Sequence, residues 1–242
     1  MLRSLRLLFN QQITRTQKEG KSLVTTSHQI EDLAAVPNTS LRESFDSETR
    51  AVFDHLVLLL AERHPVSPER LAAALGRSPE EIATTLRQLP SIELDELGNV
   101  VGAGLTLRPT PHHFTINGRT MFTWCALDAL LFPGLLGRTV QVESPCVTTG
   151  IAVRMKVTPD GIGQVEPADA VVSFVIPEAS ADIRRAFCDY VNFFSSKEAA
   201  SEWLSEHPGA TNLPVNEAYQ VGQHPAKSFL GIKEENGPGS QI

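Results

Sequence analysis

A run of helix-start signals that leads directly into a hairpin signal constrains the fold more than any other feature of this sequence. Apolar residues at helical spacing predict a first helix between about residue 47 and residue 65. Serine–proline pairs at residues 67–68 and 78–79 then supply an N-cap and a first helical residue for two more helices. Glu81 adds the glutamate of a capping box at the third helix. After this helix, alternating apolar residues flank the turn dipeptide Gly98-Asn99, so a hairpin follows.

Three helices and a hairpin in this order are typical of a winged helix. At 242 residues and 41% hydrophobic, the chain is long enough for a second domain as well. We therefore predict an α+β protein whose winged-helix-like domain covers residues 47–110. An α+β catalytic domain with antiparallel strands follows over residues 111–230. A basic, flexible extension (1–46) and a disordered tail (231–242) complete the chain.

The charge distribution argues against a nucleic-acid partner. A winged helix often binds DNA through its third helix. The net charge is −7, however, and residues 67–90 contain three basic and three acidic side chains, which leaves no cationic face for phosphates. We expect no nucleic acid and interpret the module as a packing unit. Residues 1–30 alone are basic; they resemble a transit-type leader, and a solvated extension is the simpler interpretation.

A second hairpin signal leads to the first cysteine. Asn117-Gly118 favours a two-residue turn between the strand-like runs around it. From Trp124 to Phe132 the chain is rich in Ala and Leu, and Pro133-Gly134 is expected to stop a short helix there. That helix would carry Cys125 and Asp128, and their i, i+3 spacing places them on one face.

The remaining elements are less regular. We expect strands over residues 138–143, 151–157 and 170–176, and helices over residues 180–186 and 197–207. Cys146 then lies in or beside a turn, where a thiol is most often a packing residue, so we leave it out of catalysis. Cys188 follows the first of these helices, and the pattern around it fits either a helix end or a strand.

The cysteine pattern favours free thiols in a reducing compartment. The three cysteines are an odd number and are separated by 21 and 42 positions, which fits neither a disulfide framework nor the close cysteine pairs of structural zinc sites. No apolar run approaches the roughly 20 residues that cross a bilayer. We expect a cytoplasmic protein without a membrane span.

Several motifs together resemble those of the organomercurial lyase family, also called alkylmercury lyase. The motifs are Trp124-Cys125-Ala126-Leu127-Asp128, Phe132-Pro133, Gly137-Arg138-Thr139, Val165-Glu166-Pro167-Ala168, Phe187-Cys188 and Phe193-Phe194. The resemblance spans about residues 50–225 and includes Gly104-Leu-Thr-Leu107 and Asn216-Glu217-Ala218.

The resemblance implies an activity and a set of site residues. Members of the family protonate the carbon–mercury bond of an organomercurial, releasing a hydrocarbon and Hg(II) in mercury detoxification. Cys125 and Cys188 occupy the two mercury-binding positions, and Asp128 occupies the position of the proton-handling carboxylate. The family implies no cofactor, a need for external small thiols to release Hg(II), and a mercuric reductase as its recipient. Asp189 stands where some members have a further cysteine, which weakens any role of a neighbouring thiol in metal handoff.

The chemistry of these residue types agrees with that activity. Thiolates are the soft ligands that polarisable Hg(II) prefers. A second thiolate on an R–Hg–S centre makes the carbon more basic, and Asp128 can take a thiol proton and then deliver it to that carbon. Apolar neighbours would raise the pKa of this carboxyl and receive the organic group. The candidates for such a pocket are Trp124, Leu127, Phe187 and Phe193.

Other interpretations stay open at this point. The thiols are also compatible with a mercury-binding or sensing protein whose winged helix acts on DNA. His112-His113 with Cys125 would suggest a Cys–His hydrolase, but no orienting partner or oxyanion motif accompanies them.

Overall fold

The computed structural model describes residues 46–89, 91–175 and 182–229, with side chains as far as residue 222. The predicted N-terminal extension and C-terminal tail lie outside these residues, apart from Asp46. In the described part, no helix is long and apolar enough to cross a membrane.

Three helices form the N-terminal module, as their caps predict. They are α3 (Ser47–Leu60), α4 (Pro68–Leu75) and α5 (Pro79–Leu86). The Ser67 side chain accepts a hydrogen bond from the Arg70 N–H at 3.2 Å, and Ser78 and Glu81 form the expected capping box. The cap signals therefore located both short helices correctly.

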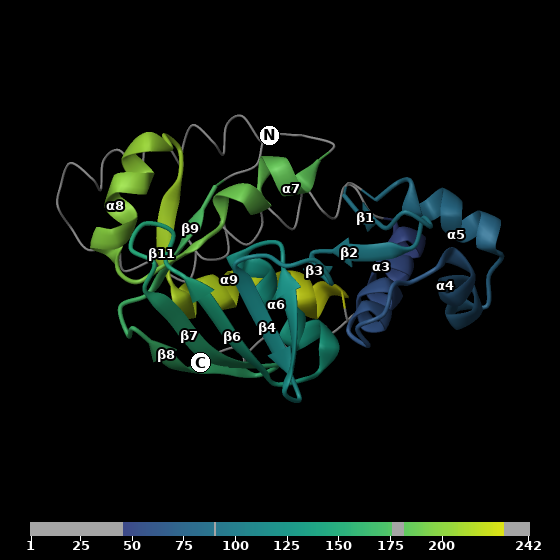
Figure 1. The fold of residues 1–242 in the computed structure, drawn as a ribbon, viewed down its shortest axis with the longest axis horizontal. Helices are drawn as coiled ribbons and strands as arrows, with labels where there is room; N and C mark the ends of the chain where they lie inside the picture. Colours follow the sequence, from purple (N-terminus) through teal and green to yellow (C-terminus); the bar gives the residue numbers. More distant parts are fainter. Residues whose placement is uncertain (1–45, 90, 176–181, 230–242) are drawn as a thin grey trace, which may run out of the picture.

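One antiparallel sheet of eight strands runs through most of the protein (Figure 1). Its strands are β1 (Glu93–Leu94), β2 (Val100–Ala103), β3 (Leu105–Thr106), β4 (His112–Ile116), β5 (Arg119–Thr123), β6 (Val140–Pro145), β7 (Ala152–Thr158) and β8 (Gly161–Glu166). The spatial order is β1-β2-β3-β5-β4-β6-β7-β8. The wing hairpin β1–β2 is thus continuous with the larger part of the sheet. The domain boundary at residue 110 stays a prediction, and this sheet runs across it.

The return strand of the wing is shorter than expected. The β-type residues from Val100 to Leu107 predict a single return strand, but the chain turns back on itself at Gly104, which has a φ of +79°. As a result β2 and β3 pair with each other, and β3 continues the sheet onto β5. Residues that favour strands occupy this run whether it forms one strand or two, so the sequence pattern does not reveal the turn.

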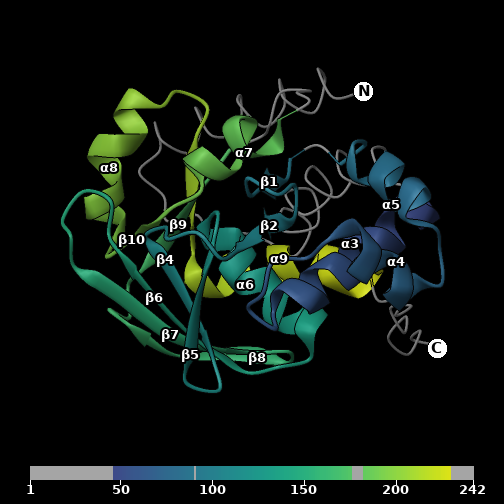
Figure 2. The ribbon, with the colours of Figure 1, turned by 45° about the vertical axis from the view of Figure 1, so that its right-hand side comes forward.

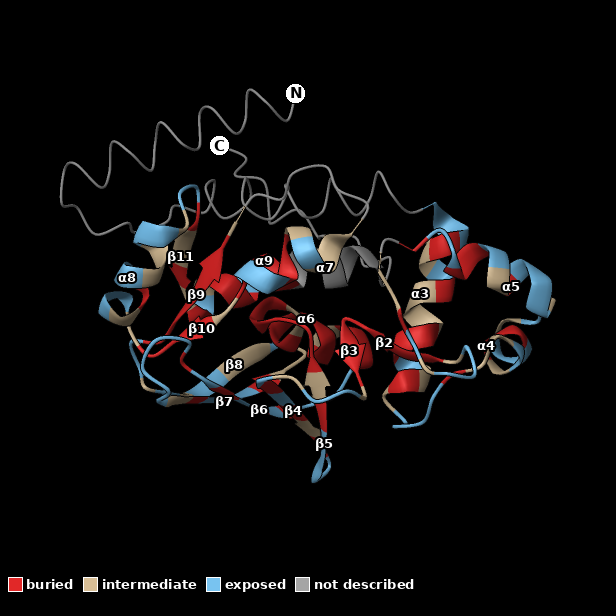
Figure 3. Ribbon diagram, turned by 45° about the horizontal axis from the view of Figure 1, so that its top comes forward, coloured by how far each residue is buried: buried red, intermediate tan, exposed pale blue. Residues whose placement is uncertain are grey.

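Helices α6 (Ala126–Leu136) and α9 (Val215–Phe229) pack against each other over one face of the sheet (Figure 2). Strand β6 alternates strictly between buried and exposed residues, which gives the sheet one face toward α6 and one toward solvent. Helix α6 is buried almost along its whole length (Figure 3). It forms the centre of the core.

Helix α6 is longer than predicted. The sequence suggested a stop at Pro133-Gly134, but the helix continues to Leu136 and ends at Gly137. Proline removes one backbone donor in a helix interior. Here the burial of Leu135 and Leu136 favours an additional turn.

A smaller sheet and short helices complete the fold beside the first sheet (Figure 1). Its three strands lie in the spatial order β10 (Phe193–Phe194), β9 (Val171–Phe174) and β11 (Thr211–Pro214), and α9 follows β11 in the chain. The same region contains α7 (Ile183–Ala186), the 3₁₀ turn η1 (Cys188–Tyr190) and α8 (Lys197–Glu206). The pattern missed β8, β11 and α9. In β8 no residue is fully buried, so no apolar alternation marks it as a strand.

Candidate active site

Cys125 is the N-cap of α6, and only Trp124 separates it from strand β5. Its backbone is extended and its thiol caps the helix, accepting a hydrogen bond from the Asp128 N–H at 3.4 Å. The prediction that both residues lie inside the helix on one face is therefore wrong for Cys125. The capping geometry still places the thiol beside Asp128, because an N-cap side chain reaches the third helical residue.

Cys188 comes to the same place from another part of the chain. The N–H of Ala126 donates to the Val191 carbonyl at 3.0 Å, and the Val191 N–H donates to the Cys188 carbonyl at 3.1 Å. Cys188 begins the turn η1, so it lies neither in a regular helix nor in a strand. Its sulfur is 4.0 Å from Asp128 Oδ2. Both sulfur atoms and a carboxylate oxygen of Asp128 lie within 4.8 Å of one another.

Both thiols are buried and are not in a disulfide. Cys125 is fully buried and Cys188 is 5% exposed. Burial raises the pKa of the Cys125 thiol well above its usual value, and contact with Cys188 and the Asp128 charge act in the same direction. For Cys188, contact with the Cys125 thiol lowers the pKa, but burial and the Asp128 charge outweigh it, so the pKa is raised. Without a substrate, both groups therefore favour the protonated thiol.

Asp128 is suited to move a proton in this setting. Desolvation raises the pKa of its carboxyl to about 6, although hydrogen bonds from Cys125 and the charge of Arg184 oppose the shift. The residue as a whole is partly buried, while its carboxyl group lies deep among protein atoms. A carboxyl with a pKa near the working pH can serve as base and as acid in turn.

The four apolar residues predicted to line a pocket lie in the same hydrophobic core as the two thiols. Trp124, Leu127, Phe187 and Phe193 are all buried and belong to the hydrophobic cluster that contains both thiols. The pocket for an organic group stays a prediction. A groove of about 740 Å³ lies elsewhere, between the end of α3, the β4–β5 turn and the end of α6.

The structure gives other roles to two residues weighed in the sequence. His112 Nδ1 lies 2.9 Å from Ser144 Oγ, and burial lowers the pKa of its ring to about 4, so the ring stays neutral. Cys146 packs with Val171, Phe194 and Ala200 in a second, smaller cluster. Neither residue joins the group formed by Cys125, Asp128 and Cys188.

Gly104 is a site residue whose role the sequence did not reveal. A Cβ atom added there would lie 2.7 Å from Phe132 Cζ and 3.5 Å from Asp128 Oδ1. The Gly104 carbonyl also accepts the Trp124 N–H at 2.8 Å. The turn between β2 and β3 therefore lies directly against the carboxylate, and a close backbone approach requires glycine.

We predict that Gly104→Ala is clearly more destabilising than Gly118→Ala. Both glycines have positive φ (+79° and +74°), but a Cβ at Gly118 meets no atom within 4 Å. The backbone strain, about 1–2 kcal/mol, is common to both variants. The clash with Phe132 adds about 1–3 kcal/mol at Gly104 only. Urea unfolding of the two variants measures the difference, and equal losses would contradict the close packing at Gly104.

We predict that Asp128→Asn stabilises the protein at pH 8 and not at pH 4. The carboxyl holds its proton more tightly in the folded state, with a pKa of about 6, than in the unfolded state, with a pKa near 3.8. Wild-type stability should therefore fall as the pH rises from below 4 to above 6. Asparagine does not ionise, so the variant should gain about 1–3 kcal/mol at pH 8. Urea unfolding at both pH values is the measurement; the same gain at pH 4 would contradict the raised pKa.

Known proteins share both the sequence and the fold. The family model for alkylmercury lyase matches residues 105–226, and the model for the helix-turn-helix domain of alkylmercury lyase matches residues 29–104. An alkylmercury lyase from Staphylococcus epidermidis is 48% identical over 206 residues, which cover 83% of this chain and 93% of that protein. One from Streptomyces lividans is 50% identical over 175 residues, covering 72% of this chain and 81% of that protein.

A solved structure agrees with this fold. The crystal structure of the mercury-bound form of MerB2 superposes with a TM-score of 0.71 at 24% identity, covering 82% of this chain and 98% of that chain. The match confirms the predicted architecture of a helical N-terminal module followed by an α+β domain. With two family models that together span most of the sequence and relatives near 50% identity, this chain belongs to the alkylmercury lyase family.

Proposed function

We propose that this chain cleaves the carbon–mercury bond of organomercurials by protonolysis, with Cys125, Cys188 and Asp128 as its catalytic and mercury-binding residues. Family membership supports the reaction. The observation that supports the residues is their grouping, with two sulfur atoms and a carboxylate oxygen within 4.8 Å in apolar surroundings. Two sulfur atoms at this separation can share one soft metal centre.

Substrate capture begins with loss of a thiol proton. The Asp128 carboxylate accepts the proton of one thiol, and the resulting thiolate binds mercury and displaces the ligand opposite the organic group. The high thiol pKa values disfavour a free thiolate in this buried site. Mercury binding offsets that cost, since the metal replaces the proton on sulfur.

Cleavage follows when the second thiol binds. The displaced ligand leaves with the first proton, so Asp128 is again a carboxylate; it accepts the proton of the second thiol, and the resulting thiolate binds mercury. Two sulfur donors increase the electron density on the carbon attached to mercury. Protonated Asp128 then donates its proton to this carbon, and the electron pair of the carbon–mercury bond forms the new C–H bond. Hg(II) remains on Cys125 and Cys188, and Asp128 is again a carboxylate.

Product release needs an exchange of ligands. We propose that no resident cofactor takes part and that external small thiols remove Hg(II), because a dithiolate site holds this ion tightly. A mercuric reductase is a suitable acceptor. The three free cysteines support a reducing, cytoplasmic location.

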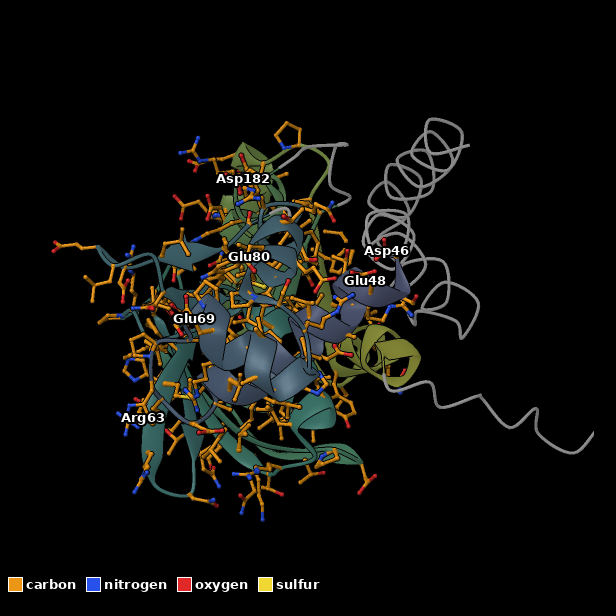
Figure 4. All side chains as sticks on the ribbon, turned by 90° about the vertical axis from the view of Figure 1, so that its right-hand side faces the viewer. Asp46, Glu48, Arg63, Glu69, Glu80 and Asp182 are labelled. Atoms are coloured by element: carbon orange, nitrogen blue, oxygen red, sulfur yellow. The ribbon has the colours of Figure 1, made fainter. Side chains whose placement is uncertain are left out.

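The N-terminal module is proposed to act without nucleic acid. Glu69 and Glu80 lie exposed at the starts of α4 and α5, on the outward side of the module (Figure 4). Exposed carboxylates oppose contact with phosphates. A packing role agrees with the continuous sheet that joins the module to the rest of the protein.

The test is anaerobic incubation of the purified protein with methylmercury and excess small thiol, with a Cys188→Ser variant beside it. Methane in the headspace of the wild type alone is the expected result. If neither protein released methane while the wild type bound mercury stoichiometrically, a sequestering or sensing protein would be the better interpretation.

A further inference from the structure

We infer that Glu93, in the wing of the N-terminal module, is a positioning residue for the active site. It holds Arg184 against Trp124 and so keeps the segment that carries Cys188 opposite Cys125. This inference rests on the proposed function, and it gives the module a specific part in the reaction.

The short helix that leads to Cys188 has little packing of its own. Helix α7 has four residues, none of them buried. Such a short, exposed helix is marginal without contacts to other elements. Phe187, which packs against Phe174, joins α7 to Cys188 on η1, so the position of Cys188 depends on this contact and on what holds α7 in place.

Two contacts to α7 come from residues just before and within β1. The Ser91 hydroxyl donates to Asp182 Oδ1 at 2.7 Å, at the N-cap of α7. Arg184 forms an ion pair with Glu93. Both contacts join residues 91 positions apart. Asp182 is labelled beside the module in Figure 4.

Glu93 is itself held firmly. Its side chain is 9% exposed, and one carboxylate oxygen accepts the Thr106 hydroxyl while the other accepts from Arg184. Gly102 lies opposite on β2, and a Cβ added there would clash with Glu93 Oε2. The carboxylate thus fills the space above a glycine. A buried carboxylate in this position is strongly disfavoured without its cationic partner.

Arg184 connects the two cysteine segments. It precedes Cys188 by four residues, and its guanidinium carbon lies 5.1 Å from the centre of the Trp124 ring. Trp124 is the neighbour of Cys125. A guanidinium can pair with a carboxylate through its N–H groups while its plane faces an aromatic ring. Glu93 orients Arg184 for this contact, and the contact fixes the distance between the two thiols.

The experiment compares Glu93→Gln, Arg184→Gln and the double variant in steady-state cleavage of methylmercury. We expect kcat to fall about tenfold in each single variant, since a misplaced second thiol slows cleavage, while KM changes by less than about twofold. The double variant should be no slower than either single variant, because Glu93 acts through Arg184. Arg184→Lys, which keeps the charge, should recover part of the loss.

A matched control and a second readout separate this role from general stability. Glu62→Gln breaks an exposed carboxylate–arginine pair with Arg70 in the same module and should leave kcat unchanged. Thermal unfolding of each variant reports on the fold. The chain has two tryptophans, so in a Trp203→Phe background the fluorescence comes from Trp124 alone. Its emission should shift in Glu93→Gln and not in Glu62→Gln.

The outcomes are distinct. If the wild type cleaves methylmercury but Glu93→Gln retains its kcat and Trp124 emission, the inference is overturned and the proposed function stands. Additive losses in the double variant would also overturn it. If the wild type released no methane, the proposed function would fail, and the Trp124 emission would still show whether Glu93 positions Arg184.

Discussion

Replacing Cys125 by serine should abolish cleavage, with a loss of at least about 10³-fold, as for other residues that bind the reacting centre directly. The residue is fully buried, and its thiol lies next to both Asp128 and Cys188. A serine hydroxyl can replace the thiol as a helix cap, so the fold should persist. It is a poor ligand for a soft metal, so the two-thiolate centre cannot form. Hydrocarbon release from methylmercury is the measurement.

Cys146→Ser is the matched control for this loss. Cys146 is also buried, but it packs in the other hydrophobic cluster. This variant should keep cleavage within about tenfold of the wild type, because it leaves all direct contacts of the reacting centre in place. Equal losses in both serine variants would mean that any buried thiol is needed, and the assignment of Cys125 would fail.

Replacing Asp128 by alanine should separate binding from cleavage. The two thiols remain, so the variant should still bind mercury stoichiometrically. Cleavage should fall about 10²–10⁴-fold, the usual contribution of a positioned proton donor. Asp189→Asn is the control, because this carboxylate is next to Cys188 but exposed. Full cleavage by Asp128→Ala would remove the carboxylate from the mechanism.

Local signals in the sequence predicted the local parts of this structure. The serine caps of α4 and α5 and the Asn117-Gly118 turn are where the pattern placed them, and α8 lies within its predicted range. Each depends on hydrogen bonds or backbone angles within a few residues. The three site residues came from their resemblance to a family, and their close approach agrees with that assignment.

Long-range contacts explain what the sequence did not reveal. A thiol at position 125 fits a helix interior or a cap equally well, and the extended strand before it decides between them. Gly104 appeared only as part of a quoted motif, because its contact with Asp128 depends on how β3 joins β5. Glu93 and Arg184 are 91 positions apart. The sequence signal for Glu93 was a single carboxylate between apolar residues in a short strand. No periodicity in the sequence identifies Arg184 as its partner.

The most direct test of the central claim is a single turnover in D₂O without external thiol. Protein in excess is mixed with methylmercury, and methane, bound mercury and free thiols are counted. We expect one equivalent of singly deuterated methane, with Hg(II) retained on the protein and two thiols lost to titration. Methylmercury bound intact, without methane, would contradict protonolysis at the site formed by Cys125, Cys188 and Asp128.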